Sequence, residues 1–127
     1  MEAADFKRAS HAVWEAMVAG RDDRHAYVEQ TARPVADRML EPPAPAPHQA
    51  ILELAAGTGL VGFAAAALVG SGGRVIVSDF SEAMVVAAER RAAELGVENV
   101  ECRVLDAERL ELPDAAVDGV LCRWDTC

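Results

Sequence analysis

The segment from Ile51 to Gly62 constrains the fold of this chain more than any other. It runs from a short apolar stretch, ILEL, through Gly57 and Gly59 into a segment that is apolar on nearly all sides. Glycine permits backbone conformations and close approaches that side chains forbid, so such a turn brings the backbone near a ligand at the carboxyl end of a strand. The segment therefore predicts a strand, a ligand-binding turn and a helix buried against a sheet.

Short apolar runs alternate with helical segments in the second part of the chain. We expect strands at residues 51–54, 74–78, 100–105 and 117–122, and helices at residues 58–69 and 81–95. The second of these helices is followed by Gly96, which suits a C-terminal cap. Strands that alternate with helices form a parallel sheet through right-handed crossovers. The predicted fold class is therefore α/β.

The first 48 residues have a different character. Apolar residues at helical spacing between His25 and Leu40 predict a helix, and Pro34 is expected to begin a short second helix there. The segment EPPAPAPH at residues 41–48 holds four of the six prolines and predicts an extended linker. We therefore expect a helical cap with a proline-rich linker at residues 1–48 and a second domain at residues 49–127.

Composition and charge exclude several classes of partner. The 12 basic and 21 acidic residues give a net charge of -9, which disfavours binding to nucleic acid or to an anionic membrane surface. The longest apolar run, residues 60–70, is too short to span a bilayer, and residues 1–10 lack the apolar core of a secretory signal. Three cysteines without metal-ligand spacing disfavour a disulfide framework and a zinc site. We expect a cytoplasmic protein without a metal.

Two acidic residues narrow the choice of ligand. Gly57, Gly59 and Gly62 spell GxGxxG, and Asp79 follows at the distance expected of an acid that holds ribose hydroxyls in dinucleotide sites. Glu53 lies inside the first apolar strand, where an uncompensated carboxylate is costly to bury. It would repel a pyrophosphate and favour a cationic ligand such as S-adenosylmethionine. The alternatives are a merely structural glycine turn and a solvent-facing Glu53 on an edge strand.

Four motifs in order resemble those of the class I S-adenosylmethionine-dependent methyltransferases, particularly the ubiquinone/menaquinone-biosynthesis type. ILELAAGTG at residues 51–59 is similar to the first motif, and VIVSDFSEAMV at residues 75–85 to the second. VLDAERLELPDAAVDGVLCR at residues 104–123 resembles the third and fourth. The family often has glycine where this chain has Ala55, which narrows the turn slightly. The joint order is more specific than any single motif.

The resemblance implies which residues bind the methionine part of the cofactor. Glu53 would be the partner of its amino end, with Gly57, Thr58 and Gly59 forming the turn beneath it. Arg123, at the end of the fourth strand, would lie at the methionine moiety.

The resemblance also implies how the adenosine part is held. Asp79 would bind the ribose hydroxyls, and Phe80 and Met84 would pack on adenine. Asp106 would accept a hydrogen bond from the exocyclic amine, and Ala107 would supply backbone. The alternatives are that Asp79 caps a helix, that Phe80 and Met84 are ordinary core residues, and that Asp106 closes a turn.

The resembled fold has seven strands, of which this chain supplies the first four of a Rossmann-like parallel sheet, preceded by N-terminal helices. We therefore expect a truncated chain, with acceptor-binding residues and any general base beyond Cys127, so no catalytic residue is named. Trp14, His25 and Tyr27 are candidates for a lid of the kind that such methyltransferases often carry, or else for the helical core.

The expected function is methyl transfer from S-adenosylmethionine to a small-molecule acceptor. The alternatives are a fragment of an NAD(P)-dependent oxidoreductase, suggested by GxGxxG and Asp79, and a truncated binding module without activity. The strand at residues 117–122 would have an open edge with neither lysine nor proline. Such an edge predicts self-association.

Overall fold

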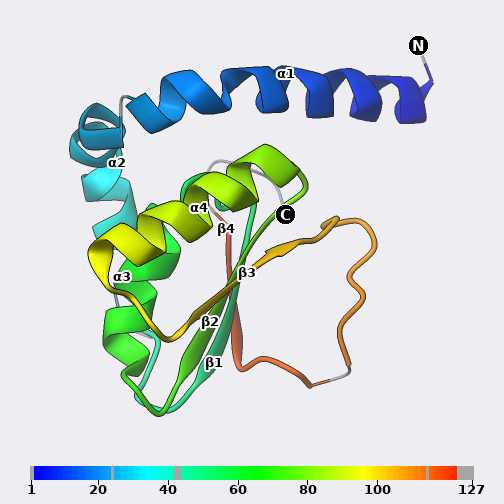
Figure 1. The fold of residues 1–127 in the computed structure, drawn as a ribbon. Coiled ribbons are helices and arrows are strands. Elements are labelled where there is room, and N and C mark those ends of the chain that lie inside the picture. Colours follow the sequence, from blue (N-terminus) through cyan, green and yellow to red (C-terminus); the bar gives the residue numbers. More distant parts are fainter. Residues whose placement is uncertain (1, 24, 42–43, 114, 123–127) are drawn as a thin grey trace.

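The computed structural model describes residues 2–23, 25–41, 44–113 and 115–122 (Figure 1). Two helices come first, α1 (Ala3–Asp23) and α2 (His25–Met39). They are followed by β1 (Ala50–Leu54), α3 (Leu60–Val69), β2 (Arg74–Asp79), α4 (Glu82–Leu95), β3 (Val100–Val104) and β4 (Gly119–Cys122). The paired strands are parallel and lie in the order β3-β2-β1-β4. The predicted α/β class is confirmed, and β1 lies inside the sheet.

The predicted strands are present, with small changes at their ends. The largest change is in β4, which begins at Gly119 instead of residue 117. Asp118 attaches to β1 in a different way: its N–H donates to the carbonyl of Ala50 at 2.7 Å, and its carboxylate accepts the N–H of Ala50 at 2.8 Å. From there the parallel register pairs Ile51 with Gly119 on one side and with Val75 on the other.

The two crossover helices start and stop at residues suited to those places. α3 begins at Leu60, later than predicted. Gly57 and Gly59 have φ values of 58° and 95°, and a right-handed helix cannot include residues with positive φ. Ser81 caps the start of α4 with its side chain, and Gly96, with φ 69°, forms its C-terminal cap. The cap predicted at Gly96 is confirmed.

The prediction that Pro34 begins a second helix is wrong, because Pro34 lies inside the continuous helix α2. A proline at this position removes one backbone hydrogen bond, the one to the carbonyl of Gln30. Tertiary packing offsets the loss. Ala32 and Ala36, on either side of the proline, are buried in one cluster with residues of α3, so α2 is held on α3 both before and after the proline.

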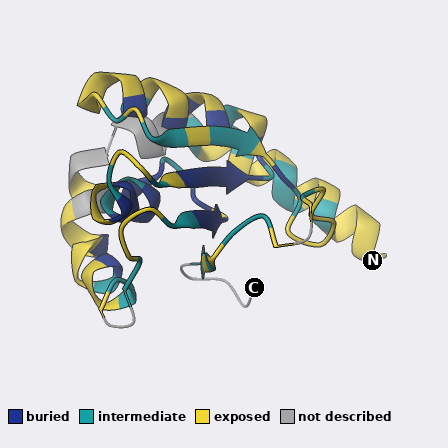
Figure 2. Cartoon of the chain, turned by 90° about the horizontal axis from the view of Figure 1, so that it is seen from below, coloured by how far each residue is buried: buried dark blue, intermediate teal, exposed yellow. Residues whose placement is uncertain are grey.

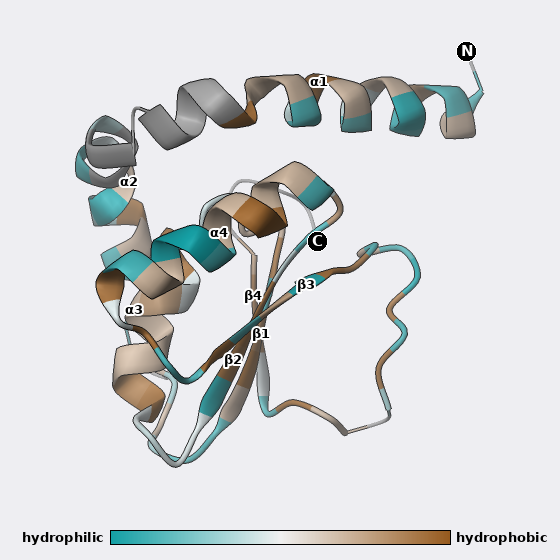
Figure 3. Ribbon diagram, in the orientation of Figure 1, coloured by the Kyte–Doolittle hydropathy of each residue, from teal (hydrophilic) through white to brown (hydrophobic). Residues whose placement is uncertain are grey.

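The sheet is packed on both faces (Figure 2). α3 and α4 cover one face, whose core comprises Ile51, Val75 and Val77 of the strands with Ala65, Ala66, Val69 and Ala88 of the helices. The other face buries Leu52, Leu54 and Ile76 with Leu105, against Leu112 and Val117 of the loop between β3 and β4. β1 and α3 are strongly hydrophobic, whereas hydrophilic residues recur along the coloured part of α1 (Figure 3).

Helix α1 lies across α4 and the carboxyl ends of the strands (Figure 1). Of its side chains that the structure describes, none is buried, and the half-buried ones are Lys7, Ser10, His11, Glu15 and Val18. Polar groups therefore contribute much of the contact between α1 and the rest of the molecule. Among the helices of the described residues, none is long and apolar enough to cross a membrane.

Gly62 allows α3 to approach the sheet closely. A Cβ at this position would lie 2.5 Å from Oε1 of Glu53 and 2.8 Å from Cγ2 of Val77. The N–H of Gly62 also donates to Oε1 of Glu53 at 2.9 Å. Any side chain here would push the helix away from both β1 and β2.

We predict that Gly62→Ala lowers the free energy of unfolding by about 1–3 kcal/mol, the usual cost of overpacking a core. The better helix propensity of alanine, worth about 1 kcal/mol, opposes this only in part. Urea denaturation measures the difference. Ala67→Ser, which adds one atom on the exposed side of α3, serves as the control and should change stability by less than about 0.5 kcal/mol. A Gly62→Ala protein as stable as the wild type would contradict the close packing.

Candidate functional site

The turn after β1 has three residues with left-handed backbone. Ala55, Gly57 and Gly59 have φ values of 51°, 58° and 95°. This conformation is ordinary for the glycines but costs an alanine about 1–2 kcal/mol, so Ala55 takes up a backbone shape for which glycine is the usual residue. Thr58 lies half-buried between the two glycines. The chain thus turns sharply at the carboxyl end of the inner strand.

Glu53 is buried at the end of β1, with 2% of its surface exposed. Its Oε1 accepts the N–H of Gly62 in the first turn of α3 at 2.9 Å. The alternative of a solvent-facing glutamate on an edge strand is wrong, because β1 lies between β2 and β4. A negative charge is favourable at a helix N-terminus, and Glu53 already occupies an amide that a phosphate would need there.

Asp79 joins the turn after β1 to the start of α4. It is 7% exposed, and its two carboxylate oxygens accept the N–H of Gly57 at 3.0 Å and the N–H of Ser81 at 2.9 Å. The side chain that caps α4 is that of Ser81, whose Oγ accepts the N–H of Met84 at 3.1 Å. Asp79 is thus positioned at the carboxyl end of β2, and its contact with ribose stays a prediction.

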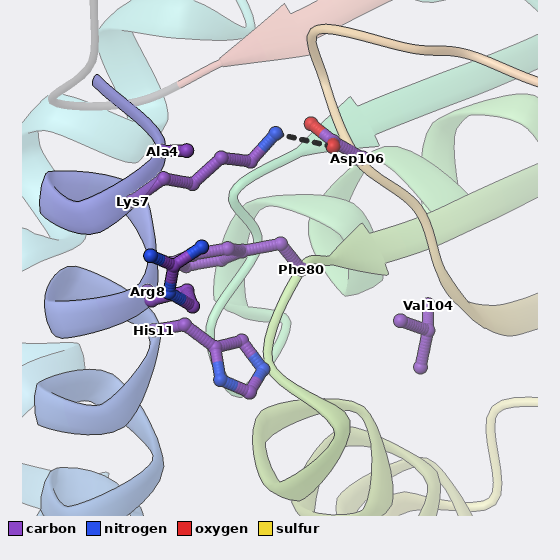
Figure 4. Close-up of a pocket in the computed structure, with 7 residues that line it drawn as sticks. All are labelled: Ala4, Lys7, Arg8, His11, Phe80, Val104 and Asp106. Atoms are coloured by element: carbon purple, nitrogen blue, oxygen red, sulfur yellow. Dashed lines mark hydrogen bonds and ion pairs between the residues drawn. The ribbon is translucent and has the colours of Figure 1, made fainter. Parts of the chain in front are cut away.

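Phe80 and Met84, both predicted to pack on adenine, lie in different surroundings. The ring of Phe80 points toward α1 and meets the ring of His11 edge-on, with a centroid distance of 5.3 Å (Figure 4). Met84 is 1% exposed and lies in the interior. This position agrees with the alternative that Met84 is an ordinary core residue. Phe80 therefore borders open space, and the adenine contact of Met84 stays a prediction.

The loop after β3 is attached to α1 by charge. Asp106 forms an ion pair with Lys7 through Oδ2, and its Oδ1 accepts the N–H of Glu108 at 3.0 Å. The carboxylate of Glu108 is the second partner of Lys7, with Oε2 at 2.9 Å from Nζ. The hydrogen bond from Lys7 is the main cause that lowers the pKa of Asp106, and the bond to Asp106 is the main cause that raises the pKa of Lys7.

Two cavities of about 610 Å³ each lie between α1 and the carboxyl ends of the strands, a size typical of small-molecule sites. The first is lined by Ala4, Lys7, Arg8, His11, Phe80, Val104 and Asp106 (Figure 4). The second lies between α1 and the segments that follow β1 and β3, and includes Leu54, Ala55 and Ala107. Lys7, Phe80 and Asp106 line both cavities, so they form the boundary between them.

Helix α1 supplies functional candidates that our sequence analysis missed. Lys7, His11 and Glu15 are four residues apart and all contact the loops after β2 and β3 or the start of α4. Glu15 accepts the hydroxyl of Ser81 at 2.8 Å and the N–H of Ala83 at 3.1 Å, and these bonds lower the pKa of its carboxyl. The sequence did contain a signal for them: polar side chains four residues apart lie on the same face of a helix.

The residues predicted for a lid lie elsewhere. Tyr27 is 65% exposed, and neither Tyr27 nor Trp14 lines the two cavities. The side chain of His25 lies outside the described residues. The cavities are covered instead by the part of α1 from Ala3 to His11.

Most of the predicted site residues converge at one end of the sheet. The structure places there Glu53, Gly57, Thr58, Gly59, Asp79, Phe80, Asp106 and Ala107. Met84 lies beneath them in the core, and Arg123 lies outside the described residues. Over the described ranges, no group of three or more His, Cys, Asp or Glu side chains is arranged to hold a metal ion.

Comparison with known proteins agrees with this geometry. A family model described as a methyltransferase domain matches residues 51–127. Nocamycin O-methyltransferase of Saccharothrix syringae is 40% identical over 88 residues, which cover 69% of this chain and 31% of that protein. The ubiquinone/menaquinone biosynthesis C-methyltransferase UbiE of Acidiphilium cryptum is 40% identical over 77 residues, which cover 60% of this chain and 30% of that protein.

Solved structures share the fold. The crystal structure of a SAM-dependent methyltransferase from Aquifex aeolicus superposes with a TM-score of 0.64 and 26% identity, over 68% of this chain and 46% of that one. The chain spans less than a third of the length of the two curated relatives. Through the family model, which covers more than half of its residues, the chain belongs to the S-adenosylmethionine-dependent methyltransferases.

Proposed function

We propose that the protein transfers a methyl group from S-adenosylmethionine to a small-molecule acceptor, and that this chain holds the cofactor. S-adenosylmethionine supplies an electrophilic methyl group on a sulfonium, so the task of the protein is to bind both reactants and to orient them without water. Of the residues described, Glu53 and the glycine turn would hold the methionine end, and Asp79 and Asp106 the adenosine end. The support for a small-molecule acceptor is that Nocamycin O-methyltransferase and UbiE bear the names of such enzymes.

The observation that carries the choice of cofactor is the buried contact between Glu53 and the amide of Gly62. A dinucleotide places its pyrophosphate on free amides at the N-terminus of the first crossover helix. Here a carboxylate occupies one of those amides and would repel the phosphates. A sulfonium and an ammonium group are attracted by the same charge, so the geometry disfavours the NAD(P) alternative that GxGxxG suggests.

We expect S-adenosylhomocysteine and S-adenosylmethionine, but not NAD, to raise the melting temperature of the protein. A ligand that binds only the native state stabilises it by about 2.7 kcal/mol at one hundred times its dissociation constant. Thermal denaturation with each ligand measures the effect. A shift with NAD alone would favour the oxidoreductase, and no shift with any of them would favour a module without cofactor.

We expect Asp79→Ala to weaken the binding of S-adenosylhomocysteine about tenfold or more, because hydrogen bonds to a charged group contribute about 1.5–3 kcal/mol. Isothermal titration calorimetry measures the dissociation constant. Asp37→Ala, the same change on the exposed side of α2, is the control and should bind normally. Normal affinity of Asp79→Ala together with a lower melting temperature would mean that Asp79 only joins the turn to α4.

We further propose that the chain self-associates through β4, one of the two outer strands of the described sheet. Val120 is 55% exposed on this strand, and an exposed apolar residue on an outer strand favours pairing with another chain. Light scattering should show a mass that rises with concentration, and Val120→Lys should reduce it. Val86→Lys, at a residue 60% exposed on α4, is the matched control and should leave the mass unchanged. A wild-type protein that stays monomeric would disprove the proposal.

We also propose a cytoplasmic location. Its support is the free thiol of Cys102, since free thiols persist in reducing compartments. Cys122 is disulfide-bonded, which is unusual in a reducing compartment. The number of cysteines alone therefore does not exclude a disulfide.

A further inference from the structure

The ammonium group of Lys7 connects α1 to two acidic residues of one loop. It forms an ion pair with Oδ2 of Asp106 (Figure 4) and contacts Oε2 of Glu108 at 2.9 Å. The other oxygen of Asp106 accepts the N–H of Glu108. Both oxygens of Asp106 therefore have protein partners, and Lys7 contacts both carboxylates at once.

This ion pair lies where a ligand has to pass. Lys7, Asp106 and Phe80 line both cavities, so a ligand that extends from one into the other must pass beside them. Under the proposed function, Asp106 accepts a hydrogen bond from the exocyclic amine of adenine. Lys7 occupies the same carboxylate with a full positive charge, which makes a stronger hydrogen bond than a neutral amine.

A second set of contacts holds α1 in place when the contact between Lys7 and Asp106 is lost. Glu15, two turns along the same face, accepts hydrogen bonds from Ser81 and Ala83 at the start of α4. Lys7 and Asp106 are each about one-third exposed, at 38% and 35%, so water and ions replace their contact at small cost. Loss of the contact with Asp106 thus leaves Lys7 on Glu108 and does not displace the helix.

We infer that Lys7 is a specificity-determining residue of the cofactor site: it competes with the adenine amine for Asp106, and Glu108 is the acceptor that it keeps when the cofactor binds. The inference rests on the proposed function, which assigns Asp106 to adenine. It makes the affinity for cofactor depend on Lys7 and Glu108 in opposite directions. A merely structural role would make removal of either residue harmful.

The test is calorimetric titration of the whole chain with S-adenosylhomocysteine. Lys7→Met should bind about two- to fivefold more tightly, the range set by a partly exposed ion pair. Glu108→Gln should bind more weakly by a similar factor, because Lys7 then stays on Asp106. In the Lys7→Met protein, Glu108→Gln should have no further effect. Arg38→Met removes a positive charge that pairs with Glu41 on the surface, and serves as the control.

A second ligand separates competition from a general loosening of α1. S-inosylhomocysteine carries an oxygen in place of the adenine amine, and this oxygen accepts a hydrogen bond from Lys7 but donates none to Asp106. Lys7→Met should therefore weaken the binding of S-inosylhomocysteine and strengthen the binding of S-adenosylhomocysteine. Equal changes for both ligands, or weaker binding of S-adenosylhomocysteine by Lys7→Met, would overturn the inference and leave the proposed function intact. A wild-type chain that does not bind S-adenosylhomocysteine would overturn both.

Discussion

The buried hydrogen bond between Glu53 and the amide of Gly62 is the interaction on which the rest of the site depends. A carboxylate taken out of water requires donors in fixed positions, since an unpaired charge inside a protein costs several kcal/mol or more. The helix amide is such a donor only if α3 lies close to β1, and α3 lies that close only because residue 62 has no side chain. The strand, the glycine turn and the helix therefore hold one another in place, and the turn keeps its left-handed shape.

From this centre the site extends outward through hydrogen bonds rather than through apolar packing. Asp79 ties the glycine turn to Ser81, and Ser81 in turn donates to Glu15 of α1. The innermost members are buried, whereas the outermost are partly exposed to water. Exposed polar contacts open at low free energy, so the outer wall of the cavities is the part of the site best able to move. Movement of α1 would break only such exposed contacts, whereas movement of the inner wall would disrupt the buried core.

Local patterns in the sequence predicted much of this structure, and the errors have a common cause. The strands and the two crossover helices were correct because apolar periodicity, Ser81 and Gly96 act within a few residues of one another. Pro34 was misread because packing of Ala32 and Ala36 on α3 outweighs the lost hydrogen bond. Lys7 was missed because its partner Asp106 is 99 residues away in the chain.

The sequence by itself determined the order of the elements, the α/β class and the acidic and glycine residues that follow the strands, because these depend on spacing along the chain. Only the tertiary structure decided that the carboxylate of Glu53 is buried against the amide of Gly62, which makes the glycine turn unsuited to a pyrophosphate. Only the tertiary structure, too, decided which carboxylates Lys7 meets. The physical reason is the same in both cases: neighbours across a sheet or beneath a helix are chosen by burial of the whole chain, and no short stretch of residues contains that choice.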